Sequence, residues 1–183
     1  HANGNAVPEF MGFHDMSDAD LTAVISYLRT QKPVATQVPQ DEYSLIGKVI
    51  KAFLMKPNGP ARPITKYIQP DSTVKYGEYI VHSTTNCVGC HTQRDLAGNY
   101  SGPLMAGGNL MGNMVTPNLT SDSSSRIFNW TEQMFVERFR KGKLIAQSEM
   151  PWNSFRHMSD LELKAVFRYL KTLPAAKMPE LKK

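Results

Sequence analysis

Two cysteines and one histidine stand within five residues of one another, because residues 87–91 read Cys-Val-Gly-Cys-His. Thiols three positions apart on a helical turn can reach the two vinyl groups along one side of a porphyrin, and the imidazole that follows then lies under the iron. Gly89 leaves the backbone free of a side chain beside the porphyrin edge. The pattern therefore predicts a covalently attached c-type haem at Cys87 and Cys90, with His91 as an iron ligand.

Three other uses of a Cys-x-x-Cys pair compete with this interpretation. A redox dithiol of the thioredoxin type is found beside a βαβ pattern, and no such pattern surrounds residues 87–91. Half of a zinc site needs further ligands, yet the sequence has no second cysteine pair and only five histidines. Two buried cysteines without a function are the third alternative. The adjoining histidine favours haem over all three.

A second axial ligand would let the iron of an electron carrier keep its geometry when its charge changes, and methionine is the common partner of histidine in c-type haems. Among ten methionines, Met150 is the strongest candidate, because a proline follows it and stiffens its loop. Met111 and Met114 lie in a glycine-rich loop and are the alternatives. Met134, on a predicted helix over 131–141, is expected to be a core residue.

The ring nitrogen of a ligating histidine that does not face the iron usually donates to a carbonyl, which fixes the tautomer and the orientation of the ring. The Gly102-Pro103 turn follows the motif closely. We therefore expect the Pro103 carbonyl to be the acceptor for His91, with ordinary turn chemistry of a Gly-Pro loop as the alternative.

Two helices are predicted to support the motif. The residues just before it have helical spacing, with Tyr76 and Ile80 facing the core. Gly77 would allow close approach of another helix. We expect that helix to be 159–173, crossing near Tyr169.

An internal repeat links the two ends of the chain. Residues 13–30 and 155–172 are identical at ten of 18 aligned positions. Each copy predicts an amphipathic helix, and in the second copy Ser159 and Glu162 have the spacing of a capping box. The same type of helix is therefore expected at both ends.

The repeat and the proline-rich stretch after it predict the domain organisation. Residues 1–34 are expected to be the C-terminal tail of a preceding domain, residues 35–70 a linker with a short helix at 41–54, and residues 71–183 a complete domain. The start at His1, without an initiator Met, fits a mature product or an excised segment.

Composition and charge narrow the class of protein further. The 183 residues are 41% hydrophobic and 20% charged, which is typical of a globular protein with a core. No apolar run approaches the ~18 residues of a membrane span, no signal peptide is visible, and two cysteines exclude a disulfide-rich scaffold. The formal charge of +5 is scattered, which permits an acidic partner but does not argue for nucleic acid.

Residues 71–175 resemble the class I cytochrome c fold, and more narrowly the haem domains in the cytochrome subunits of bacterial periplasmic alcohol, aldehyde and gluconate dehydrogenases. The segments that carry the resemblance are YGEYIVHSTTNCVGCHTQ, the glycine pair 107–108, TPNLTSDSSSRIFNWTEQMF, RFRKGK and MPWNSFRHMSDLELKAVFRYLKTLP. The resemblance implies an all-α cytochrome c fold around one covalent haem c, preceded here by the C-terminal helix of a second cytochrome-like domain.

The resemblance also implies roles for individual residues. Cys87 and Cys90 would form the thioethers, and His91 and Met150 would be the proximal and distal ligands. The remaining implied roles are orientation of His91 by Pro103, a contact of Trp130 with the haem edge or a propionate, and closure of the propionate side by Asn118 and Thr120. Turn chemistry and core packing are the alternative for these last residues.

The resulting expectation is an electron carrier of the bacterial periplasm that works with redox partner proteins such as a dehydrogenase, an oxidase or another cytochrome. The rivals are a haem enzyme with a displaceable distal ligand, such as a peroxidase, and a module that docks a dehydrogenase or oxidase complex. Basic residues at the end of the 131–141 helix either balance the helix dipole or steer an acidic partner: Arg138, Arg140, Lys141 and Lys143.

Two further expectations concern the ends of the chain. In the extended alignment of the repeat, Val7 takes the place of Met150, so the preceding domain would lack the usual distal ligand or use another residue such as Met11. The C-terminal Lys177, Lys182 and Lys183 are expected to belong to a solvated tail.

Overall fold

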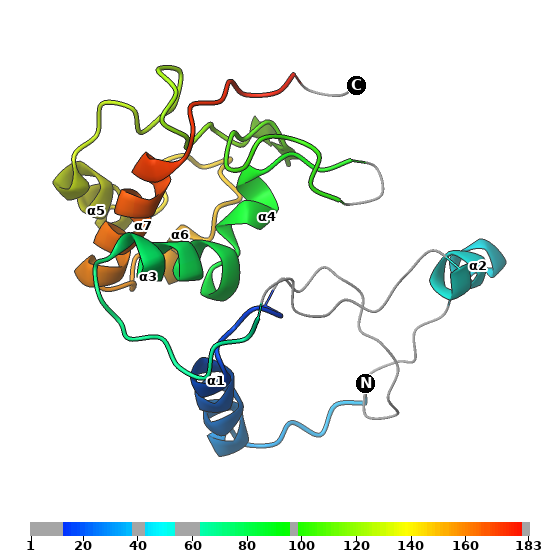
Figure 1. The fold of residues 1–183 in the computed structure, drawn as a ribbon. Helices are drawn as coiled ribbons and strands as arrows, with labels where there is room; N and C mark the ends of the chain where they lie inside the picture. Colours follow the sequence, from blue (N-terminus) through cyan, green and yellow to red (C-terminus); the bar gives the residue numbers. More distant parts are fainter. Residues whose placement is uncertain (1–12, 38–42, 54–62, 96–98, 181–183) are drawn as a thin grey trace. The chain divides into compact units, whose positions relative to one another are not determined.

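The computed structural model describes residues 13–37, 43–53, 63–95 and 99–180. The chain forms two compact units, His1–Ile68 and Gln69–Lys183, and each is considered by itself. Nearly all regular structure in the described residues is helical, with one two-stranded antiparallel sheet (Figure 1). The expected all-α fold class is confirmed.

The second unit holds the cysteine motif and most of the buried residues. Its elements in chain order are α3 (Val74–Tyr79), the π-helical turn η1 (Ile80–Thr84), α4 (Cys87–His91), β1 (Leu110–Met111), β2 (Met114–Val115), α5 (Glu132–Arg140), α6 (Trp152–Phe155) and α7 (Asp160–Thr172). In the sheet, Leu110 pairs with Val115 and Met111 with Met114.

Helix α7 follows its sequence pattern closely. The Ser159 hydroxyl accepts from the Glu162 N–H, and the Glu162 carboxylate accepts from the Ser159 N–H, so the predicted capping box is present. The apolar stripe of α7 is at most 6% exposed along its length. The members of this stripe are Leu163, Val166, Phe167 and Leu170.

Helices α3 and α7 cross at Gly77, as predicted. A Cβ atom at this position would overlap the backbone carbonyl of Ala165 and lie 3.0 Å from the Cβ atom of Tyr169. The absence of a side chain therefore lets the two backbones touch. Tyr76 and Ile80, on either side of this contact, are buried as expected.

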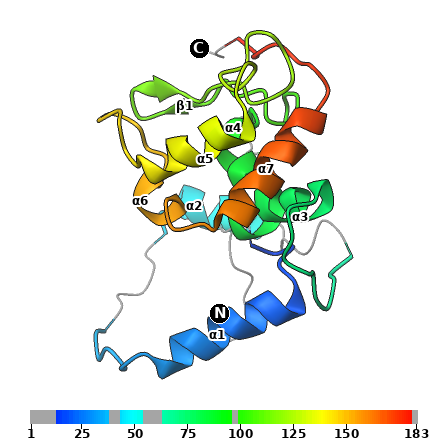
Figure 2. The same ribbon diagram turned by 90° about the vertical axis from the view of Figure 1, so that its left-hand side faces the viewer.

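Helix α5 packs on α7 and adds three aromatic or branched residues to the core, Phe135, Val136 and Phe139 (Figure 2). Met134 is 46% exposed, so its predicted place in the core is wrong. The reason is angular, because each residue advances the helix by about 100°. Position 134 therefore points well away from the stripe that these three residues form.

Arg168 ties the helices of the second unit together on their outer side. Its guanidinium donates to the Glu132 carboxylate at the start of α5 and to the Ser72 carbonyl just before α3. One side chain on α7 thus fixes the beginnings of two other helices.

The first unit contains α1 (Asp18–Thr30) and α2 (Leu45–Phe53). The short helix expected within 41–54 is therefore present. The stripe of α1 that repeats the buried stripe of α7 is 43–60% exposed, and it consists of Leu21, Val24, Ile25 and Leu28. Within the described residues, no helix has the length and hydropathy to cross a membrane.

The helix crossing generates a test of the fold. Gly77→Ala forces α3 away from Ala165, and we expect the free energy of unfolding of the haem-loaded chain to fall by about 1–3 kcal/mol. Denaturant titration followed by circular dichroism measures this change. Gly47→Ala on α2 is the control, because its Cβ would meet Ser44 at an ordinary 3.4 Å. Equal stability of the Gly77→Ala variant and the unsubstituted chain would contradict the close crossing.

Candidate functional site

The Cys-Val-Gly-Cys-His motif forms α4, a short helix that follows a sharp change of chain direction at Asn86. Asn86 adopts left-handed backbone angles, with φ of 47°, which asparagine tolerates better than most residues. A Cβ atom at Gly89 would lie 2.9 Å from the Asn86 amide nitrogen. Gly89 therefore makes room for the Asn86 side chain in this structure.

The two thiols of α4 are free and differ in accessibility. Cys87 is half-buried and Cys90 is exposed. The Thr85 hydroxyl lies 3.1 Å from Cys87 Sγ and donates its single proton to the Ile80 carbonyl, so the thiol acts as the donor toward Thr85. This arrangement turns the Cys87 sulfur toward Thr85.

Both thiols are protonated near neutral pH. Burial raises the pKa of Cys87 to about 11. Partial loss of water around the sulfur also raises the pKa of Cys90, although the residue is exposed as a whole, and the positive charge of Arg94 opposes this rise. A protonated thiol carries the sulfur and the hydrogen that a vinyl group takes up when a thioether forms.

The imidazole of His91 has one nitrogen bound and one free. His91 is 8% exposed, and its Nδ1–H donates to the Pro117 carbonyl at 3.1 Å. Burial lowers the pKa of His91, and the bond to Pro117 only partly offsets this, so the ring is neutral. Nε2 bonds to none of the described residues, so its lone pair is available for a metal.

The acceptor for His91 corrects the sequence prediction, which chose Pro103. The Pro103 carbonyl instead accepts from the Ala106 N–H at 3.1 Å, within its own turn. Both prolines follow the motif in loops, and their positions in the sequence do not show which carbonyl the folded loop brings to the ring. Pro117 lies within the T-P-N-L-T segment, which is part of the resemblance to dehydrogenase cytochrome subunits.

Two other residues hold the loops against α4, and sequence reasoning had given neither this role. Gly107, with φ of +74°, donates from its N–H to the His91 carbonyl at 2.7 Å, and a Cβ here would lie 2.6 Å from the Pro117 carbonyl oxygen. The Asn109 amide donates to the carbonyls of Cys90 and Thr92, at 2.8 and 2.7 Å, and so closes the end of α4. The Gly-Gly-Asn run was the available signal.

The residues expected on the propionate side have different surroundings. Asn118 is 3% exposed, and its amide N–H groups donate to the Ala176 carbonyl and to the Ser124 hydroxyl. Asn118 thus braces the loop, and its predicted place on the propionate side stays a prediction. Trp130 is half-buried, with its ring at 64° to that of Phe135, and in the part of the chain that is described its indole N–H has no partner. Its predicted haem contact stays a prediction.

Met150 lies half-buried in the loop between α5 and α6. This loop is anchored two residues later, where the Trp152 ring packs on Phe139, its Nε1–H donates to Ser148 and the Arg138 guanidinium stacks 3.7 Å above it. None of the described contacts joins His91 to Met150, nor to the alternatives on the β1–β2 hairpin, so the sixth ligand stays a prediction.

The predicted basic cluster is partly used inside the protein. Arg138 is stacked on Trp152 and donates to the Gly142 carbonyl. Arg140 pairs with Asp160 and donates to the Arg156 carbonyl. Lys141 and Lys143 remain exposed, so the surface charge of the cluster comes mainly from these two lysines.

Comparison with known proteins decides the class of site. Residues 74–174 match the family described as cytochrome c. The chain belongs to the cytochrome c family. Covalent haem c is therefore its cofactor, and two free thiols beside a neutral histidine with an unused nitrogen fit that group. Membership of this family, together with the relatives described next, supports electron transfer through haem.

The relatives are subunits of oxidising enzymes. The chain is 29% identical to the cytochrome c subunit of a quinone alcohol dehydrogenase from Gluconobacter oxydans, over 89% of this chain and 38% of that protein. It is 24% identical to the cytochrome c subunit of gluconate 2-dehydrogenase from Pantoea cypripedii, over 87% and 40%. It is 28% identical to the cytochrome subunit of fructose dehydrogenase from Gluconobacter japonicus, over 55% and 21%. The chain spans about two fifths of the length of the first two.

The thiol pair generates a test of covalent attachment. In material matured with haem, Cys87→Ser combined with Cys90→Ser should remove all haem staining from a denaturing gel, because no thioether can form. Each single variant is the control, since one thioether remains and staining persists. Haem retained by the double variant under denaturing conditions would contradict attachment at this motif.

Proposed function

We propose that this chain carries single electrons through one haem, attached at Cys87 and Cys90 and ligated by His91 and Met150. When bound, the haem supplies an iron that gains or loses one electron. The protein orients the proximal ring, supplies the thiols and limits access of water. The observation that supports this proposal most directly is that His91 donates from Nδ1 to the Pro117 carbonyl, while its Nε2 bonds to none of the described residues.

Met150 is our choice of distal ligand because its loop is held at one end by a rigid contact. Trp152 is packed between the α5 residues Phe139 and Arg138, and Pro151 limits the backbone between it and Met150. A thioether on such a tethered loop can stay in place when the iron changes charge. Met111 and Met114 are the alternatives, on the hairpin.

A haem enzyme, such as a peroxidase, is the second candidate. It would need a distal position that a small molecule can occupy, whereas an anchored methionine fills that position. The spectrum of the oxidised protein separates the two functions. A carrier is low-spin, with a methionine-to-iron charge-transfer band, and an enzyme is high-spin and responds to peroxide or cyanide.

We infer that the partners are redox proteins of a dehydrogenase complex in the bacterial periplasm. The relatives named above are cytochrome subunits of dehydrogenases, which supports a module between a catalytic subunit and a later acceptor. The exposed Lys141 and Lys143 give part of the surface a positive charge that would attract an acidic partner.

We further propose that residues 1–34 end a separate cytochrome-like domain, with 35–70 as linker. Helix α1 repeats the sequence of α7, yet its stripe is 43–60% exposed while that of α7 is at most 6% exposed. An amphipathic helix of this kind is stabilised by packing of its apolar face. Val7, which aligns with Met150 in the repeat, lies outside the described residues.

This organisation predicts what the gene encodes before the codon for His1. We expect the attachment half of a first cytochrome-like domain, because the α1 stripe needs the kind of helix that α3 supplies to α7. Sequencing the gene is the measurement. A start codon followed only by a signal peptide at that point would contradict the two-domain organisation.

The distal ligand has its own test. Met150→Ala should lower the reduction potential, by on the order of 0.1 V within the roughly 0.8 V range that axial ligands span, and abolish the methionine-to-iron band. Redox titration and near-infrared absorption measure these changes. Met134→Ala is the control, because that methionine is exposed on α5. An unchanged spectrum after Met150→Ala would reject this residue as the ligand.

A further inference from the structure

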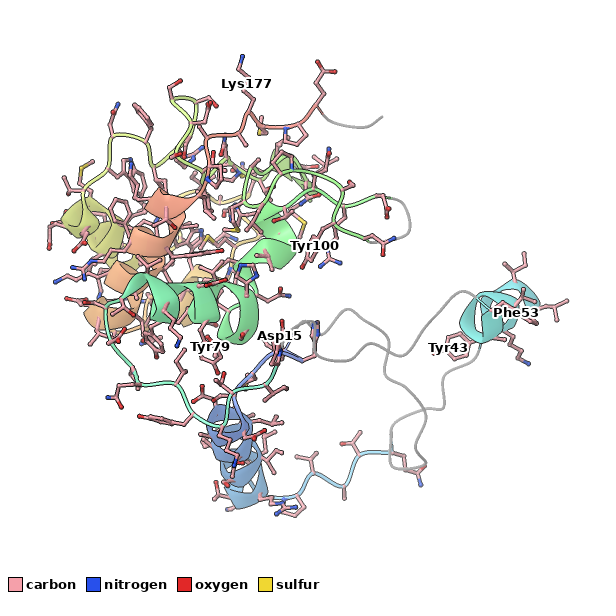
Figure 3. The ribbon with its side chains drawn as sticks, viewed as in Figure 1. Asp15, Tyr43, Phe53, Tyr79, Tyr100 and Lys177 are labelled. Carbon is pink, nitrogen blue, oxygen red and sulfur yellow. The ribbon has the colours of Figure 1, made fainter. Side chains whose placement is uncertain are left out.

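The backbone beyond α7 is bonded to the rest of the second unit, although the Lys177 side chain is exposed as expected. Lys182 and Lys183 lie outside the described residues. Residues 174–180, which we term the C-terminal strap, run back along the loops that follow α4 (Figures 1 and 2). Lys177 points its side chain away from the body of the unit (Figure 3), while the strap backbone faces the loops.

Side chains of the loops bind backbone carbonyls at three points along and just before the strap. Ser121 donates to the Leu173 carbonyl at 2.7 Å, Asn118 donates to the Ala176 carbonyl at 2.7 Å, and Gln93 donates to the Glu180 carbonyl at 3.0 Å. The strap therefore joins the loop after α4 to the loop that carries Pro117.

Asn118 is the central attachment point. Its Oδ1 accepts from the Thr120 N–H and hydroxyl, both at 2.8 Å, and its Nδ2 donates to Ala176. The side chain is 3% exposed, so loss of these partners would leave buried polar groups unsatisfied, which is costly. The Asn118 backbone is thereby held in one place.

The position of Asn118 determines the direction of the Pro117 carbonyl. The carbonyl of residue 117 and the nitrogen and Cα of residue 118 lie in one rigid peptide plane. Fixing Asn118 through the strap fixes one side of this plane, and Gly107 packs directly against the Pro117 carbonyl. Held in this way, the carbonyl points at the Nδ1–H of His91 and accepts the 3.1 Å bond.

We propose that Asn118 and the C-terminal strap form a positioning device that sets the orientation and the electron donation of the proximal histidine. The proposal rests on the proposed function, because it takes His91 as the iron ligand. A hydrogen bond from Nδ1–H to a carbonyl makes the ring a stronger donor to the metal. Stronger donation favours the oxidised iron, so an intact strap lowers the reduction potential.

The test uses the haem-loaded chain and three variants. Asn118→Ala removes the hydrogen bonds of this side chain to both Thr120 and Ala176. Asn118→Asp keeps an acceptor for Thr120 but loses the donor to Ala176. Ser121→Ala is the matched control, because it removes a bond near the strap without touching the residue beside Pro117. Redox titration gives the potential, and NMR gives the rate at which the His91 Nδ1–H exchanges with water in the reduced protein.

Asn118→Ala and Asn118→Asp should raise the reduction potential and speed the Nδ1–H exchange by roughly tenfold, the effect of weakening one hydrogen bond. Ser121→Ala should change neither. If Asn118→Ala does not take up haem, termination of the chain after Pro174 removes the same contact with Ala176 and should give the same two changes.

Variants that lose stability but keep the potential and exchange rate of the unsubstituted chain would overturn the proposal, leaving Asn118 a structural residue only. This result is distinct from failure of the proposed function. If the proposed function failed, the unsubstituted chain itself would lack a low-spin spectrum with His91 as ligand, before any variant is compared.

Discussion

The hydrogen bond from His91 to the Pro117 carbonyl is the contact on which the rest of the haem domain depends. A neutral imidazole can present either of two nitrogens, and a ligand must present the same one in every molecule. The Pro117 carbonyl selects Nδ1 as the proton carrier and leaves Nε2 free. Gly107 packs against that carbonyl, and the next residue, Asn118, is bonded to Ala176, so the need to direct a single backbone oxygen would account for residue choices in distant loops.

The helices supply a rigid frame for this contact. Helix α3 touches α7 through Gly77, and α4 follows α3 after a π-helical turn, so the position of the motif depends on the position of α7. Arg168 links α7 to the beginnings of α3 and α5. Because α7 contacts the other main helices and also leads into the C-terminal strap, it connects the core to the loops on the proximal side.

Local patterns predicted local structure well. The capping box of α7, its apolar stripe, the Gly77 contact and the motif helix all depend on residues a few positions apart, and each agrees with the structure. The Pro117 acceptor was missed because the path of a loop decides it, 26 residues from the histidine. The strap was missed for a related reason. The lysines of this segment indicate that some of its side chains face solvent, but they do not indicate whether its backbone carbonyls accept hydrogen bonds from the loops.

The burial of His91 also has a consequence for the order of biogenesis. A porphyrin is a flat, stiff disc much wider than an amino-acid side chain, and His91 is only 8% exposed in the folded chain. With His91 as the proposed ligand, the disc would reach the ring most easily on an open polypeptide. Closure of the helices and strap would then follow covalent attachment to the thiols, with the haem as part of the core on which folding is completed.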